Sequence, residues 1–243
     1  MIKVFSNLDE LDFFAAEKFI ACGNRAIEQS GKFSVALAGG STPKLLYRLL
    51  SSEQFKNKID WRKVFFFFGD ERNVSPENED SNFLMANENL LKPLQIEAKN
   101  IFRWKTELIN TEAIAENYAQ KIKDFFNLSE NEFPRFDLIL LGMGDDGHTA
   151  SLFPLTDALQ ETEKIVVSNR VEKLDTTRLT FTFPTINNSL NIIFLVGGAA
   201  KAETLQQVLE GEFQPEKYPS QAVKPRNGNL FWLIDEQAAK FLQ

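Results

Sequence analysis

The chain has 243 residues, 43% of them hydrophobic, which is enough to bury one large core or two small ones. Its formal net charge of −7 argues against a general nucleic-acid-binding surface, because phosphate backbones are bound mainly by clustered Lys and Arg. An anionic ligand would therefore have to be met by a few local cations.

Cysteine and histidine each occur once, as Cys22 and His148. A single cysteine allows neither an internal disulfide nor a thiolate zinc cage, and a single histidine excludes the usual multi-histidine metal sites. Residues 1–19 carry acidic side chains where a secretory signal needs an unbroken apolar core, and no later run is long enough to span a bilayer. We therefore expect a cytoplasmic protein without a membrane or nucleic-acid partner.

The first predicted helix covers residues 8–29, where apolar side chains recur at helical spacing and Asn7 with Glu10 resembles a capping box. A strand is predicted for residues 33–38. The loop Gly39-Gly40-Ser41-Thr42-Pro43 follows, with Thr42 as the expected N-cap and Pro43 as the first helical residue. Such a junction directs backbone N–H groups and a helix dipole at one spot, where a phosphate could bind, although ordinary turn-and-cap chemistry explains the same residues.

Four consecutive phenylalanines in residues 61–68 predict a strand that is covered on both faces. The next residues, Asp70, Glu71 and Arg72, place two carboxylates and a guanidinium just past the strand end. A solvated, ion-paired loop is the usual meaning of such a cluster, but its position at a carboxyl end favours a site. A capped helix should then run from about residue 82 to Pro93.

Helices and strands alternate through the remaining chain. The predicted helices are residues 111–126 and 199–209, together with a closing helix that Asp235 opens; the predicted strands are residues 138–141, 164–168, 179–183, 192–196 and 230–234. No linker or internal repeat interrupts this order. We expect a single α/β domain over residues 1–243, with a mostly parallel, Rossmann-like central sheet flanked by helices on both faces.

The apolar residues 138–141 lead into a glycine-rich loop that carries His148. The carboxyl end of a buried parallel strand usually opens on a ligand crevice, so His148 should lie there. Residues 142–147 also match the dinucleotide pattern G-x-G-x-x-G. We reject that interpretation because Asp145 and Asp146 would face a pyrophosphate, and Pro154 cuts short the helix that should bind it.

Three segments together resemble the 6-phosphogluconolactonase family, which is related to the glucosamine-6-phosphate isomerase/deaminases. The segments are ALAGGSTP at residues 36–43, GDERNV with the later DSN at residues 69–82, and GMGDDGHTASLFP at residues 142–154. Weaker similarity continues around Arg178, Lys201 and residues 227–235. The resemblance therefore covers nearly the whole chain.

This resemblance implies hydrolysis of 6-phospho-D-glucono-1,5-lactone to 6-phospho-D-gluconate, in the oxidative pentose phosphate pathway, without a metal or organic cofactor. A δ-lactone already has an electrophilic carbonyl, so one base and oxyanion stabilisation suffice. His148 is the candidate base and Asp146 its candidate partner. Asp70 and Arg72 match residues that line the family's site; Arg72 would either stabilise the oxyanion or pair with Asp70.

The substrate phosphate is expected at the loop of Gly40, Ser41 and Thr42, with Arg178 and Lys201 as cations, a set that the wider superfamily suggests. Two positions depart from the family pattern. Asp145 stands where proline is expected, and residues 173–178 replace a usually proline-rich approach to Arg178. The oligomeric state stays open, with a monomer favoured.

Two alternatives remain. An amino-sugar-phosphate isomerase/deaminase would need an acid after the histidine, where this chain has Ser151-Leu152-Phe153-Pro154. A non-catalytic sugar-phosphate sensor would need only the phosphate-binding residues.

Overall fold

The computed structural model describes residues 1–108 and 110–243, and its centre is a six-stranded sheet in which every pairing is parallel. The strands, in their order across the sheet, are β1 (Ile2–Phe5), β9 (Asn229–Asp235), β8 (Asn191–Val196), β5 (Leu138–Leu141), β2 (Phe33–Leu37) and β3 (Val64–Phe68). The predicted parallel α/β fold is confirmed.

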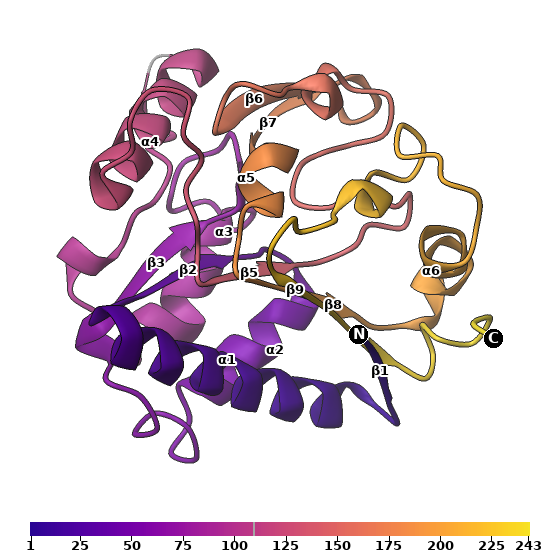
Figure 1. Cartoon of the computed structure of the whole chain (residues 1–243), viewed down its shortest axis with the longest axis horizontal. Coiled ribbons are helices and arrows are strands. Elements are labelled where there is room, and N and C mark those ends of the chain that lie inside the picture. The colour runs from indigo at the N-terminus through magenta and orange to yellow at the C-terminus, as the bar shows by residue number, and fades with distance from the viewer. Residues whose placement is uncertain (109) are drawn as a thin grey trace.

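Helices cover both faces of this sheet. They are α1 (Leu8–Ser30), α2 (Ser41–Leu50), α3 (Asn82–Ala86), α4 (Thr111–Phe126), α5 (Phe183–Asn187) and α6 (Ala202–Leu209). In Figure 1, α1 and α2 lie below the sheet, and α4 and α5 lie above it. Short 3₁₀ turns span Trp61–Lys63, Ala98–Asn100, Asp157–Gln160, Glu172–Leu174, Ala199–Lys201 and Pro219–Ala222, and a π-helical turn, Asn87–Leu91, continues α3. Because both faces are covered, every residue of β5 is buried, as its uniformly apolar sequence predicts.

A second, antiparallel sheet of three strands stands above the first (Figure 1). It consists of β4 (Asp70–Arg72), β7 (Thr176–Phe181) and β6 (Val166–Val171), in that order. The prediction that residues 70–72 form a loop was therefore wrong. These residues pair with β7, a partner that lies about a hundred positions along the chain and leaves no local signal.

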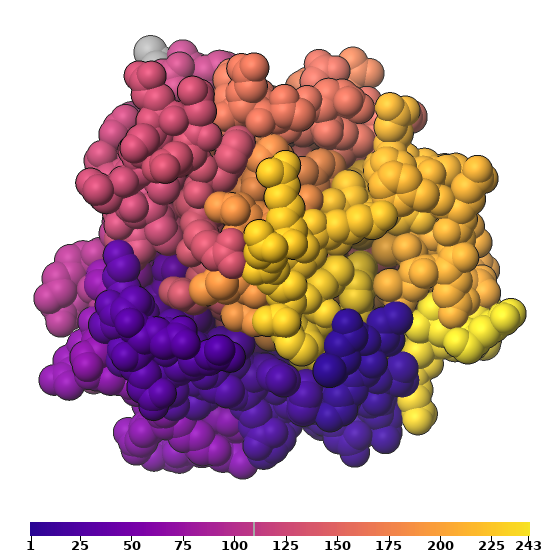
Figure 2. Space-filling model, viewed as in Figure 1, coloured from indigo at the N-terminus to yellow at the C-terminus, as the bar shows by residue number. Residues whose placement is uncertain are grey.

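Several helix boundaries also differ from the predictions. The N-cap of α2 is Gly40, with φ 102°, rather than Thr42, because a glycine at positive φ turns the chain directly into the helix. Asp235 does not open a helix: residues 236–241 form turns, and the Asp235 carboxylate accepts hydrogen bonds from the N–H groups of Gly198 and Ala238. The short strand β1 was not predicted. It packs beside β9, and Figure 2 shows the indigo N-terminal segment against the yellow C-terminal one.

Two buried tyrosines hold the chain where neighbouring strands end. The Tyr47 hydroxyl accepts a hydrogen bond from the N–H of Ala38 at 2.9 Å and donates to the carbonyl of the same residue at 2.8 Å. The Tyr118 hydroxyl likewise accepts from the N–H of Phe68 at 2.8 Å. Backbone groups that leave the sheet at these points are thus satisfied internally, and the loops after β2 and β3 start from fixed positions.

The phenylalanines of β3 fill the core on both sides of the sheet. Phe66 stacks with Trp61 on one side, at 6.3 Å between ring centroids, and Phe67 stacks with Phe102 on the other, at 4.5 Å. The predicted two-sided burial of this strand is confirmed.

Candidate active site

A cavity of about 510 Å³ opens at the carboxyl ends of β2, β3 and β5. Seven of the nine residues proposed from the sequence line it: Gly40, Asp70, Arg72, Asp146, His148, Arg178 and Lys201. The other two, Ser41 and Thr42, begin α2 beside Gly40 and are not part of the lining. The fold thus brings together groups from the two sheets and from the start of α6.

The loop after β5 is shaped around the imidazole of His148. The N–H of Gly144 donates to the His148 carbonyl at 2.8 Å, and a Cβ on Gly144 would lie 2.0 Å from the imidazole Nδ1. Gly147 has φ 80°, and its carbonyl accepts a hydrogen bond from the Ser220 hydroxyl at 2.8 Å. The glycines therefore let the backbone pass directly under the ring and turn back.

Asp146 holds the imidazole. Its Oδ1 lies 2.6 Å from His148 Nδ1, and the ring stacks on Phe153 with 4.1 Å between centroids. Partial burial opposes ionisation of Asp146, but the hydrogen bond and charge of His148 outweigh it and hold the pKa of Asp146 below its usual value. An ionised Asp146 accepts the Nδ1 proton, which leaves Nε2 as the basic nitrogen.

Asp70 is fixed by two neutral side chains rather than by Arg72. The hydroxyl of Ser151 donates to Asp70 Oδ2 at 2.7 Å, and the amide of Asn82 donates to Oδ1 at 3.3 Å. The guanidinium of Arg72 donates instead to the carbonyl of Asp80. Of the two roles considered for Arg72, this arrangement favours contact with a ligand.

Two guanidiniums stand side by side at the cavity. Arg72 in β4 and Arg178 in β7 are direct cross-strand partners in the antiparallel ladder. Burial, together with the charge of Arg72, lowers the pKa of Arg178. Like charges in cross-strand positions repel, so an anion between them would relieve the repulsion.

The neighbouring carboxylate, Glu71, has a structural role. It is buried and accepts hydrogen bonds from the N–H groups of Asn82 and Phe83 at 2.7 and 2.8 Å, at the start of α3. Burial raises its pKa, although these hydrogen bonds act in the opposite direction. Glu71 thus links β4 to α3 and is not among the residues that line the cavity.

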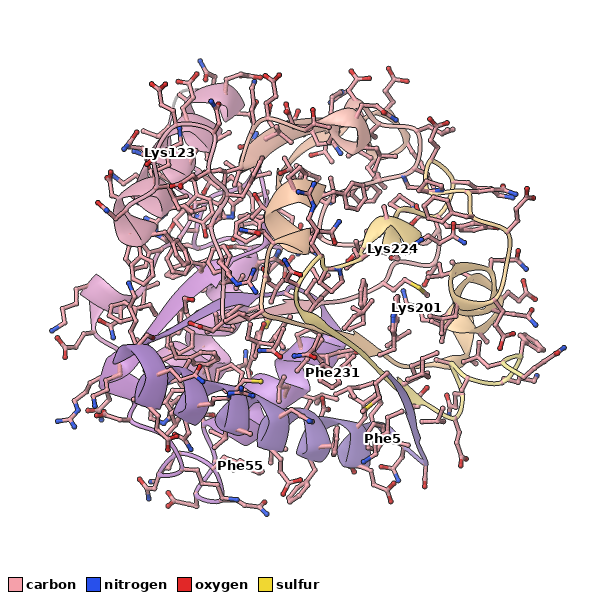
Figure 3. All side chains as sticks on the ribbon, viewed as in Figure 1. Phe5, Phe55, Lys123, Lys201, Lys224 and Phe231 are labelled. Carbon is pink, nitrogen blue, oxygen red and sulfur yellow. The ribbon has the colours of Figure 1, made fainter. Side chains whose placement is uncertain are left out.

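Each lysine at the cavity contacts a carboxylate of the His148 loop. Lys201 forms an ion pair with Asp145, and Lys173 lies 3.4 Å from Asp146. Figure 3 shows Lys201 between the sheet and α6. Neither Asp145 nor Lys173 was predicted as a site residue, although both lie at positions that depart from the family pattern.

Asn82, Ser151 and Phe153 also belong to the site and were not predicted as parts of it. Ser81-Asn82 was interpreted as a helix start and as part of the DSN segment of the family resemblance, without a role in the site, and Ser81 does cap α3. Ser151 and Phe153 fall within GMGDDGHTASLFP, so membership of that segment was the available signal.

Among residues 1–108 and 110–243, no three His, Cys, Asp or Glu side chains gather in a way that could hold a metal ion. None of the helices described there is both long and apolar enough to cross a membrane.

Comparison with known proteins identifies the class of this fold and site. The model of the family "Glucosamine-6-phosphate isomerases/6-phosphogluconolactonase" matches residues 6–232. The chain belongs to this family.

Its relatives within that family include several 6-phosphogluconolactonases. The chain is 44% identical to the 6-phosphogluconolactonase of Nostoc sp. over 88% of its own length and 86% of the relative's, and 41% identical to that of Synechocystis sp. over 90% and 88%. The solved 6-phosphogluconolactonase of Trypanosoma brucei superposes with a TM-score of 0.87 at 30% identity, covering 100% of this chain and 98% of the other. A monomeric glucosamine-6-phosphate deaminase, 22% identical, shares the fold with a TM-score of 0.80 over 98% of each chain.

Proposed function

We propose that this chain hydrolyses 6-phospho-D-glucono-1,5-lactone to 6-phospho-D-gluconate, with His148 as the general base. The observation that carries the proposal is the His148–Asp146 pair, 2.6 Å apart, in a cavity that two guanidiniums also line. The names of the relatives from Nostoc and Synechocystis support the same reaction.

His148 Nε2 would take a proton from a water molecule as the water oxygen bonds to the lactone carbonyl carbon. The resulting tetrahedral oxyanion collapses and breaks the bond from that carbon to the ring oxygen. The imidazolium then returns its proton to the ring oxygen, so the base is restored. Asp146 keeps Nδ1 protonated and stabilises the imidazolium while it exists.

The cations would divide between the two negative charges of the reaction. Arg72 is our candidate for the oxyanion, because its guanidinium is directed at a carbonyl and the cavity rather than at Asp70. Arg178, Lys201 and the loop of Gly40, Ser41 and Thr42 would bind the phosphate. Asp70, held by Ser151 and Asn82, would orient the sugar hydroxyls by accepting hydrogen bonds.

Lactone hydrolysis by wild type and by His148→Ala, each corrected for the spontaneous rate, tests the proposal. We expect the variant to lose about 10²- to 10⁴-fold in kcat, the usual range for a general base. Its binding of 6-phosphogluconate, measured by calorimetry, should largely survive and serves as the control for folding. Equal rates for the two proteins would contradict the role of His148.

Two other outcomes would point to the alternatives. No acceleration by wild type, with phosphogluconate still bound, would favour a sensor. Ammonia release from glucosamine 6-phosphate would favour the isomerase/deaminase, which in our proposal is disfavoured because Phe153 stacks on His148 where that group carries an acid.

A further inference from the structure

One of the two cations proposed for the substrate phosphate already has an anionic partner within the chain. Lys201 Nζ forms an ion pair with Asp145 Oδ1. The Lys201 side chain is only 26% exposed, whereas Asp145 is 70% exposed. The lysine therefore has little freedom to turn elsewhere, while the carboxylate lies at the rim and can swing into solvent.

A phosphate that binds Lys201 must compete with this carboxylate. If the carboxylate stayed in place, its charge would repel the incoming phosphate; if it moved away, the ion pair would be lost. In both cases, part of the free energy that Lys201 contributes to phosphate binding is offset by the cost of displacing or opposing the carboxylate. Substrate and product of the proposed reaction carry the same phosphate, so both are affected.

We propose that Asp145 is an internal competitor for the phosphate at Lys201, which weakens the binding of substrate and product alike and limits product inhibition. This inference rests on the proposed function for the identity of the ligand, but the competition itself concerns any phosphate. Among the described residues, the Asp145 carboxylate is paired with Lys201 and forms no hydrogen bond or ion pair with His148 or Asp146. It is therefore a residue that sets affinity rather than rate.

The position of the loop does not depend on the ion pair. The Thr204 hydroxyl donates to the backbone carbonyl of Asp145 at 2.6 Å, and the Gly147 N–H donates to the carbonyl of Gly144 at 3.1 Å. Both contacts use backbone oxygens and persist when the side chain changes. Removing the carboxylate should thus free Lys201 without moving His148.

The main test compares wild type with Asp145→Asn. Calorimetric titration with inorganic phosphate should show about two- to fivefold tighter binding by the variant, the range expected for loss of a partly exposed ion pair. In the lactone assay, KM and the inhibition constant of 6-phosphogluconate should fall by a similar factor while kcat stays the same. The gain should shrink at high salt, which screens the pair.

Glu203→Gln is the matched control, because Glu203 is exposed on α6 only two residues from Lys201 and its removal changes the net charge equally. It should leave phosphate affinity as in wild type. In a Lys201→Met background, Asp145→Asn should have no further effect. The inference would be overturned if wild type and Asp145→Asn bound phosphate equally well. It would also be overturned if Glu203→Gln raised phosphate affinity as much as Asp145→Asn does, or if Asp145→Asn still raised it in the Lys201→Met background.

The phosphate titration separates this inference from the proposed function. Tighter phosphate binding by Asp145→Asn without lactone hydrolysis by wild type would support the competition and contradict the lactonase assignment. Hydrolysis by wild type with unchanged phosphate affinity in the variant would support the lactonase assignment and contradict the competition.

Discussion

Two glycine-rich loops follow the neighbouring strands β2 and β5, and the chain fixes them by different means. Backbone and hydroxyl hydrogen bonds cross the loop after β5, including the one from the Thr149 hydroxyl to the Gly142 carbonyl at 2.9 Å. The loop after β2 is shorter and passes at once into α2, where Gly40 is the N-cap and no side chain caps the helix. One loop presents side chains, and the other presents the start of a helix.

This difference matches what each loop is proposed to do. A proton-transfer group must be held in a narrow range of positions, since a displacement of about 1 Å can cost about 10²-fold in rate. An anion needs only converging N–H groups and positive charge, which tolerate small displacements. Changes that displace His148 in the loop after β5 should therefore alter kcat, and changes in the loop after β2 should alter KM.

Gly144→Ala should have the larger effect. Its Cβ would lie 2.0 Å from His148 Nδ1, so the imidazole must move away from its place against Phe153. We expect kcat for lactone hydrolysis to fall by about 10²-fold. Because Gly144 does not have a positive φ, backbone strain is not the cause, and a circular dichroism melt should show a folded protein. An unchanged kcat would mean that the position of His148 does not govern the rate.

Gly40→Ala should have a smaller effect of a different kind. Its φ of 102° lies in a region that is costly for any residue with a Cβ, although the nearest atom to that Cβ is 3.9 Å away. The start of α2 should shift, and KM should rise about five- to tenfold, which corresponds to about 1 to 1.4 kcal/mol.

Gly31→Ala provides the matched control for Gly40→Ala. Gly31 also has a positive φ, 78°, and open space around its Cβ position, but it lies at the opposite end of β2. It should lower stability and leave KM unchanged. A similar rise of KM in both variants would show that strain, and not the place of Gly40, is responsible.

Asp12→Asn should have the smallest effect on activity, because Asp12 lies in α1, outside both loops. Asp12 is buried, and among the described residues neither of its carboxylate oxygens has a hydrogen-bond partner. Burial, and to a smaller extent the charge of Asp9, raises its pKa to about 7. The folded protein thus binds this proton more tightly than the unfolded chain does. This residue's contribution to stability should fall as the pH rises from about 4 to about 7 and then level off.

Urea unfolding of wild type and Asp12→Asn across this pH range measures that contribution. The free energy of unfolding of the variant, relative to that of wild type, should increase as the pH rises, by at most about 4 kcal/mol at pH 8. Asp9→Asn, at an exposed position, should change the pH dependence of the unfolding free energy much less. A difference between wild type and Asp12→Asn that does not vary with pH would contradict the raised pKa.

Local sequence patterns were enough for the elements whose signals are strong. The predicted bounds of α4 and β5 match those of the structure. An amphipathic period of 3.6 indicates a helix, and a short, fully apolar run that ends at a glycine indicates a buried strand. The α2 cap was misplaced because Gly40 and Thr42 both satisfy capping preferences, and only the backbone angle of Gly40 separates them.

Resemblance located most of the candidate site, but not the contacts within it. The pairing of Ser151 with Asp70 joins residues 81 positions apart, and no local pattern encodes it. The same holds for the register that sets Arg72 opposite Arg178.

The sequence by itself thus determined the parallel α/β fold, the buried strand β5 and the glycine loop that carries His148, because propensity, apolar period and glycine placement act over a few residues. The tertiary structure decided which groups meet in the cavity. It set Arg72 beside Arg178, turned Glu71 inward and paired Lys201 with Asp145, since these contacts depend on strand order and on the packing of α3 and α6 against distant loops.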